Sequence, residues 1–129
     1  MMGGASNPDL AAVHAAAVTY CNAVYKAQAD VFETLCHDAF HMVCVDGPDM
    51  QFWDKPAYLA RVTARDAAAG DPVYEILSVE ADGDMARVKL RVGVPGVLYE
   101  DYLGFVRVCG DWKLMNKLFR TYDGSLAAG

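Results

Sequence analysis

Two polar side chains interrupt an otherwise apolar surface predicted near the C-terminus, and they are the first candidates for chemistry. Asp101 lies in the segment DYLGF, and Asn116 lies in GDWKLMNKLF. A carboxyl group on an apolar surface loses its hydration, which raises its pKa and suits it to proton transfer. The alternative is structural, because a buried carboxylate is normally partnered: Asp101 would then pair with Arg120 or accept a hydrogen bond from Asn116 or a tyrosine.

His41 is the second chemical candidate, since an imidazole can act as a general base near neutral pH. It lies in the short β-prone segment FHMVCV. A lone strand histidine also commonly forms a hydrogen-bonded part of a pocket wall, so both interpretations stay open. We therefore take His41 and Asp101 as the candidate catalytic residues.

Aromatic side chains at core spacing can fill the interior or stack on a flat ligand. Four of them lie in elements that we expect to converge. The predicted ligand pocket consists of Tyr20, His41, Val43, Trp53, Tyr58, Asp101, Phe105 and Asn116.

A metal site is considered because Cys36, His37, His41 and Cys44 have a spacing that superficially suits zinc. These residues span a predicted helix end and a strand, so their side chains should diverge. The sequence also contains no glycine-rich phosphate loop and no GxSxG motif. We expect no metal and no cofactor.

The elements that must position these residues are helices first and strands afterwards. Helices are predicted over Pro8 to Lys26 with Asn7 as cap, over Val31 to Cys36 with Asp30 and Glu33 as a capping box, and after Asp54 with Pro56 in the first turn. A small hairpin is predicted from Phe40 to Val45 and Met50 to Trp53, followed by strands over Val73 to Ala81, Met85 to Val94, Val97 to Cys109 and Trp112 to Tyr122. Segregated elements of this kind are typical of an α+β fold.

The turn within Cys109 to Asp111 decides which side chains share a face of the last hairpin. A two-residue turn puts Asp101 and Asn116 on the inner face. The outer face then carries the predicted homodimer interface, which consists of Tyr102, Val106, Met115, Lys117 and Phe119. A three-residue turn would reverse this parity and bring Lys117 inside, where it would hold an anionic ligand.

Composition and charge limit the remaining possibilities. The 129 residues fit one domain over 1–129, with an ordered core at about 7–122, and 54% are hydrophobic. A net charge of -6 argues against binding to nucleic acid or to an anionic membrane surface. Four cysteines without a CxxC pair suit reduced thiols, and no segment reads as a membrane span, so we expect a cytoplasmic protein.

This layout resembles the nuclear transport factor 2-like superfamily, and most closely its lumazine-binding and polyketide-cyclase-like (SnoaL-like) branch. The residues that carry the resemblance are Tyr20, Asn22, Tyr25, Ala29, Asp30, LCHDAF at 35–40, DYLGF at 101–105 and GDWKLMNKLF at 110–119. The resemblance implies a strongly curved mixed or antiparallel sheet of about six strands, wrapped around the N-terminal helices into a cone. It also implies a hydrophobic pocket and a homodimer.

Isomerase-like members of this superfamily place a carboxylate base on the first strand, a tyrosine on the first helix and an acid on the penultimate strand. Here the base position falls near Val43, with His41 on the same face as the nearest substitute, whereas Tyr20 and Asp101 match the other two. The resemblance therefore implies a domain that binds a small apolar or aromatic molecule. The alternatives are a cofactor-independent isomerase, dehydratase or cyclase that uses His41 or Asp101, and a dimerisation module without a ligand.

Overall fold

The structure is a computed structural model that describes residues 7–124, the side chain of Asn7 excepted. Its helices are α1 (Asn7–Lys26), α2 (Ala29–Leu35) and α3 (Lys55–Thr63). Its strands are β1 (Cys36–Cys44), β2 (Gln51–Asp54), β3 (Tyr74–Asp82), β4 (Met85–Val94), β5 (Val97–Val108) and β6 (Asp111–Thr121). Each predicted element is present, with ends that differ by a few residues.

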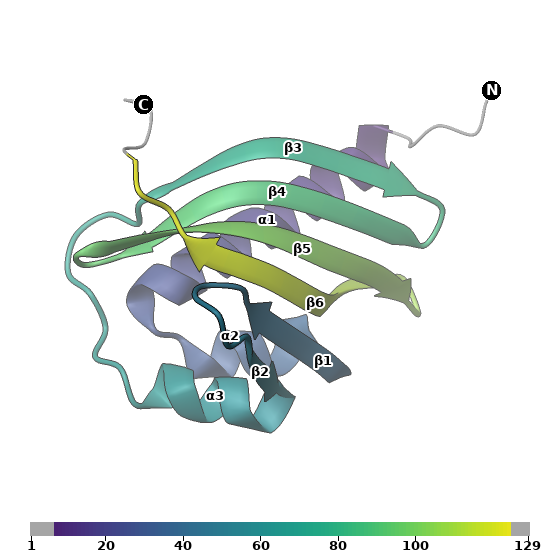
Figure 1. The fold of residues 1–129 in the computed structure, drawn as a ribbon. Helices are drawn as coiled ribbons and strands as arrows, with labels where there is room; N and C mark the ends of the chain where they lie inside the picture. Colours follow the sequence, from purple (N-terminus) through teal and green to yellow (C-terminus); the bar gives the residue numbers. More distant parts are fainter. Residues whose placement is uncertain (1–6, 125–129) are drawn as a thin grey trace.

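The strands form one sheet in the order β2-β1-β6-β5-β4-β3. All neighbours are antiparallel except β1 and β6, which are parallel. The sheet curves around α1, while α2 and α3 lie at the end near β1 and β2 (Figure 1). The predicted α+β fold with a curved, mixed, six-stranded sheet is confirmed.

The helices begin where their first residues can satisfy free backbone amides. At α3 the Asp54 carboxylate accepts a hydrogen bond from the Ala57 amide at 3.0 Å, and Pro56 occupies the first turn, as predicted. At α2 the predicted capping box is wrong: the cap is Gln28, without a side-chain hydrogen bond, because the helix starts earlier and Asp30 already belongs to its first turn. The predicted cap by Asn7 lies outside the described side chains.

One face of α1 supplies the core that the sheet covers. Val13, Ala17, Tyr20 and Val24 are buried, at the three- and four-residue steps that a helix face requires. They pack against inward side chains of β3 and β4. This packing places the hydroxyl group of Tyr20 deep inside the cone.

The last hairpin turns through two residues, Cys109 and Gly110. Val108 pairs with Asp111, and both turn residues have positive φ, 51° and 86°. This geometry is typical of the primed turns that match the twist of antiparallel strands. The hairpin therefore starts with the predicted parity.

The parity changes four residues after the turn because β6 contains a β-bulge. Phe105 lies opposite Leu114, but Gly104 lies opposite Asn116, so Met115 is an extra residue in β6. Beyond it, Lys117 and Phe119 are buried, 6% and 5% exposed. The prediction that Asn116 faces inward and that Lys117 and Phe119 face outward is wrong, because the bulge moves each later side chain to the opposite face.

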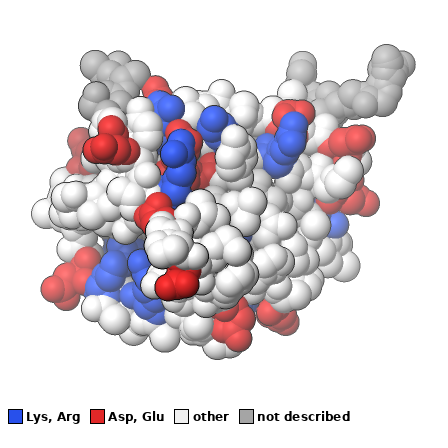
Figure 2. Space-filling view, in the orientation of Figure 1, with Lys and Arg blue, Asp and Glu red and all other residues white. Residues whose placement is uncertain are grey.

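The outer face of the sheet divides into a charged part and an uncharged part. Arg87 pairs with Glu80 across β3 and β4, and Glu100 on β5 accepts from both Arg91 and Arg120. Lys, Arg, Asp and Glu gather over the upper strands of this face, whereas the area over β6 and β1 is largely uncharged (Figure 2). Arg87, Lys89 and Arg91 of β4 belong to the charged part of this outer face.

Deletion of Met115 should leave the fold intact, because it removes only the extra residue and lets Leu114 and Asn116 keep their present partners. We expect a loss of about 1–2 kcal/mol in the free energy of unfolding, measured by urea denaturation. Deletion of Leu118 is the matched control. It would turn Phe119 outward and cost at least about 3 kcal/mol. Equal losses in the two variants would contradict the assigned bulge.

Candidate functional site

Asp101 on β5 lies at the centre of the cone and is fully buried. Its Oδ2 atom accepts a hydrogen bond from the hydroxyl group of Tyr20 on α1. The Nζ atom of Lys117 on β6 lies 3.9 Å from the same oxygen. The Oδ1 atom has no hydrogen-bond partner, and within residues 7–124 it is the one buried side-chain oxygen or nitrogen of which this holds.

Burial affects the proton equilibria of all members of this cluster. Loss of hydration raises the pKa of Asp101, while Lys117 and Tyr20 act in the opposite direction. The pKa of Tyr20 is raised well above its usual value by burial and by the neighbouring Asp101 charge. Tyr20 therefore remains a protonated donor, and the carboxyl group of Asp101 holds a proton more readily than an exposed one.

Lys117 lies between this cluster and the adjoining cavity. Its Nζ atom is 4.6 Å from the ring centroid of Phe119, 5.0 Å from that of Tyr58 and 5.2 Å from that of Tyr20. Burial lowers the pKa of Lys117, whereas the Asp101 charge raises it. Three aromatic faces and one carboxylate thus compensate an ammonium group that has lost most of its hydration.

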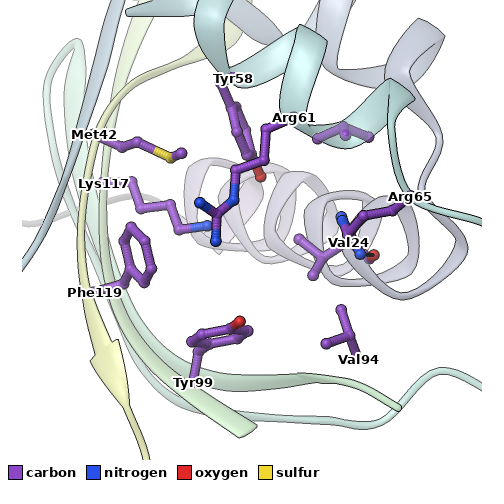
Figure 3. Close-up of a pocket in the computed structure, with 10 residues that line it drawn as sticks. Val24, Met42, Tyr58, Arg61, Arg65, Val94, Tyr99, Lys117 and Phe119 are labelled. Carbon is purple, nitrogen blue, oxygen red and sulfur yellow. Dashed lines mark hydrogen bonds between the residues drawn. The ribbon is translucent and has the colours of Figure 1, made fainter. Parts of the chain in front are cut away.

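A cavity of about 50 Å³ lies beside Lys117, between α1, α3 and the inner face of the sheet (Figure 3). Its walls combine aliphatic and aromatic groups with three cations. The lining residues are Val24, Met42, Tyr58, Arg61, Val62, Arg65, Val94, Tyr99, Lys117 and Phe119. In Figure 3 the Arg61 side chain extends from α3 toward Lys117.

Of the predicted pocket residues, Tyr58 lines this cavity. Trp53 lies near it, with its ring 5.9 Å from that of Phe119 and the Arg61 guanidinium 4.9 Å above it. Tyr20, Asp101 and Phe105 are buried but do not line the cavity. Lys117 lines the cavity and also lies beside Asp101, so it separates the carboxyl group of Asp101 from the cavity.

His41, Val43 and Asn116 lie on the outer face, contrary to the expectation that they enter the pocket. In β1 the buried side chains are those of Cys36, Phe40 and Met42. The alternation around Met42 turns His41 and Val43 outward. Asn116 lies against Gly104, where a Cβ atom would approach its Oδ1 to 2.5 Å. The structure therefore does not bring His41 and Asp101 together.

The residues of the predicted dimer interface lie on both faces of the sheet. Tyr102 is 51% exposed on the outer face, and Val106 and Met115 are half-buried there. Lys117 and Phe119 lie inside, so their assignment to an outer interface is wrong. Leu118 takes their place on the outer face, with 48% of its surface exposed.

Sequence reasoning missed most of the cavity wall. Arg61 lies in the last turn of α3, and Arg65 lies two residues after its end. Their four-residue spacing was readable from RVTAR as two cations on one side of a helix end. The inward position of Met42 follows from its alternation with Phe40. The inward position of Lys117 could be predicted only with knowledge of the bulge, which has no signature in the sequence.

Within residues 7–124 no group of three or more His, Cys, Asp or Glu side chains is placed to hold a metal ion. Cys36 is buried, and burial raises the pKa of its thiol to about 12. In the described part of the chain no helix is long and apolar enough to cross a membrane. The candidate site thus consists of the cavity and the Tyr20, Asp101 and Lys117 cluster behind it.

Lys117→Met should destabilise the protein in a pH-dependent manner, because it leaves Asp101 buried without a cation. Removal of Lys117 raises the pKa of Asp101 further above its usual value of 3.8, so the added loss is small near that value and grows as the pH rises. We expect a loss of about 3 kcal/mol near pH 8 and a smaller one near pH 5, measured by urea denaturation.

Lys113→Met is the matched control, since the Lys113 ammonium donates to the Thr34 carbonyl at 2.8 Å at the exposed end of β6. Its effect should be small and equal at both pH values. A loss in Lys117→Met that does not change with pH would contradict the electrostatic coupling of Lys117 to Asp101.

Comparison with solved structures shows the same fold in proteins of low sequence identity. An NTF-2 like protein of unknown function from Silicibacter pomeroyi is 22% identical, with a TM-score of 0.84 over 92% of this chain and 99% of that one. An NTF2-like protein of unknown function from Shewanella baltica is 13% identical, with a TM-score of 0.83 over 93% and 98%. A ketosteroid isomerase-like protein from Erwinia carotovora atroseptica is 17% identical, with a TM-score of 0.71 over 92% and 100%.

Sequence comparison adds the family. No curated protein matches the chain. The family model described as "Putative lumazine-binding" matches residues 8–120, which is most of the chain. The chain therefore belongs to the putative lumazine-binding family, and it shares its fold with the NTF2-like proteins named above.

Proposed function

We propose that this chain is a binding domain for a small, largely apolar or aromatic molecule held inside the cone. The observation that carries the proposal is the cavity beside Lys117, whose walls include Met42, Tyr99 and Phe119. Pockets for small molecules combine such apolar walls with a few convergent polar groups. Here the convergent group is the ammonium of Lys117.

The size of the cavity limits what it accepts. Its 50 Å³ exceeds the roughly 10–15 Å³ that one water molecule needs, but it is far below the space for a large cofactor. It is also smaller than the roughly 150 Å³ of a cavity that encloses benzene. One edge of a small ring, or one end of a longer molecule, fits this description. The ligand class is therefore a small molecule, in keeping with an interior lined by side chains from α1, α3 and four strands.

Proton-transfer catalysis of the isomerase, dehydratase or cyclase kind has weaker support. A general acid or base must lie within hydrogen-bond reach of the substrate. Asp101 does not line the cavity, and His41 lies on the outer face of the sheet. Binding of a small molecule does not require Asp101 or His41 to contact the ligand. The positions of these two residues therefore agree better with binding than with catalysis.

We also propose that the domain forms a homodimer through the uncharged part of its outer face. Tyr102, Leu118 and Phe52 are exposed there, Phe52 by 68%, and half-buried Met115 and Val43 adjoin them. An exposed apolar surface with charged residues at its edge is typical of an interface between subunits. The paired charges of Glu100 and Arg120 would lie at its rim.

A cytoplasmic location is part of the same proposal. All four cysteines are free, and Cys109 is exposed in the β5–β6 turn. Free thiols persist in a reducing compartment and tend to form disulfides in an oxidising one.

The proposed binding function predicts that benzyl alcohol, a small neutral aromatic probe, enters the cavity. The methyl resonance of Met42 should shift with saturation in a titration followed by NMR of methyl-labelled methionine, because Met42 lines the cavity. Met85, which is 62% exposed at the far end of the sheet, should not shift.

Val94→Trp should abolish this shift because it fills the cavity, whereas Val97→Trp on the same hairpin should not, since Val97 does not line it. Absence of a saturable Met42 shift in the unmodified protein would refute the proposed binding.

The proposed homodimer predicts that Leu118→Lys converts dimers to monomers, because it places a charge in the apolar contact. Sedimentation velocity at micromolar concentration measures the change. Leu77→Lys on the edge strand β3 is the matched control, exposed to 39%, and should leave the dimer unchanged. A monomeric unmodified protein at that concentration would refute the proposed interface.

A further inference from the structure

The charged residues that line the cavity are all cationic. Arg61, Arg65 and Lys117 contribute to its walls, and no Asp or Glu side chain among the described residues does so. The whole chain carries a net charge of -6, so this concentration of positive charge opposes the general composition. The carboxylate of Asp101 is fully buried beside Lys117 and does not line the cavity.

The two cavity arginines differ from the other four arginines of the chain in their partners. Each of the other four forms an ion pair with an Asp or Glu, and these are Arg87, Arg91, Arg107 and Arg120. Within the described residues, Arg61 contacts the Trp53 ring at 4.9 Å and Arg65 donates to the Val24 carbonyl at 3.1 Å, but neither forms an ion pair. The guanidinium groups of Arg61 and Arg65 are therefore available to pair with an anion.

The cations also act on one another. The charges of Arg61 and Arg65 both lower the pKa of Lys117, in addition to burial. Like charges that converge on one cavity destabilise each other, and an anion placed between them would relieve that repulsion. In Figure 3 the Arg61 side chain extends toward Lys117, and Arg65 lies on the other side of the view.

We propose that the molecule bound in this cavity is a small organic acid, whose carboxylate is held by Arg61 and Lys117. The inference rests on the proposed binding function and adds the ligand class. A guanidinium group presents two parallel N–H donors that match the two oxygens of a carboxylate, and an ammonium group adds a point charge. The apolar body of the acid would lie against Tyr99, Phe119 and Val94.

Arg65 has a different part in this arrangement. Its bond to the Val24 carbonyl links the segment that follows α3 to α1. It also adds positive charge to the cavity wall. Arg61 has no such bond among the described residues, so its guanidinium can turn toward a ligand.

The test compares benzoate with benzyl alcohol, which has the same ring and no charge. Both are titrated into the unmodified full chain, with the Met42 methyl resonance as the measure of occupancy. Benzoate should bind at least about tenfold more tightly, since a charge-assisted hydrogen bond supplies the corresponding free energy. Added salt should weaken benzoate binding and leave benzyl alcohol binding unchanged.

Arg61→Gln should reduce the affinity for benzoate about tenfold and leave that for benzyl alcohol within about twofold. Arg87→Gln is the matched control on the outer face and should change neither affinity. Circular dichroism and thermal unfolding establish that both variants are folded.

Equal affinities of the unmodified protein for benzoate and benzyl alcohol would overturn the carboxylate inference and leave the proposed binding function standing. An unchanged preference for benzoate in Arg61→Gln would overturn the role of Arg61. If neither compound shifts Met42, both the inference and the proposed binding function are overturned.

Discussion

The carboxyl group of Asp101 is fully buried, and the interior of the cone is arranged around that constraint. Tyr20 supplies a hydrogen bond from α1, and Lys117 supplies a positive charge from β6. Neither partner is sufficient alone, since a buried carboxylate needs both charge compensation and hydrogen bonds. The cluster thus joins the long helix to the two central strands, and its cation forms one wall of the cavity.

The ion pair with Lys117 exists only because of the extra residue in β6. Without the bulge at Met115, the alternation of the strand would place Asn116 inside and Lys117 in solvent. Asp101 would then lie beside an amide instead of an ammonium group. One inserted residue therefore decides whether the buried carboxylate has a positive charge beside it.

The fold was predictable from the sequence because its signals are local. The periodic apolar face of α1, the Asp54 cap and the short turns between strands each follow from neighbouring residues, and the turn at Cys109 and Gly110 has its predicted length. The site was less predictable because it depends on long-range register. Asp101 and Tyr58 were placed correctly inside, but His41 and Asn116 were not, since strand alternation and a bulge decide their faces.

The stacking of Arg61 on Trp53 gives the cavity an optical reporter of its own. The chain has two tryptophans, and each has an arginine 4.9 Å from its ring centroid: Arg61 over Trp53 and Arg107 over Trp112. Arg107 is fixed by ion pairs with Asp9 and Asp84, whereas Arg61 has none among the described residues. A molecule that draws Arg61 away from its indole would change the emission of Trp53 alone, and Trp112 would serve as an internal reference in the same spectrum.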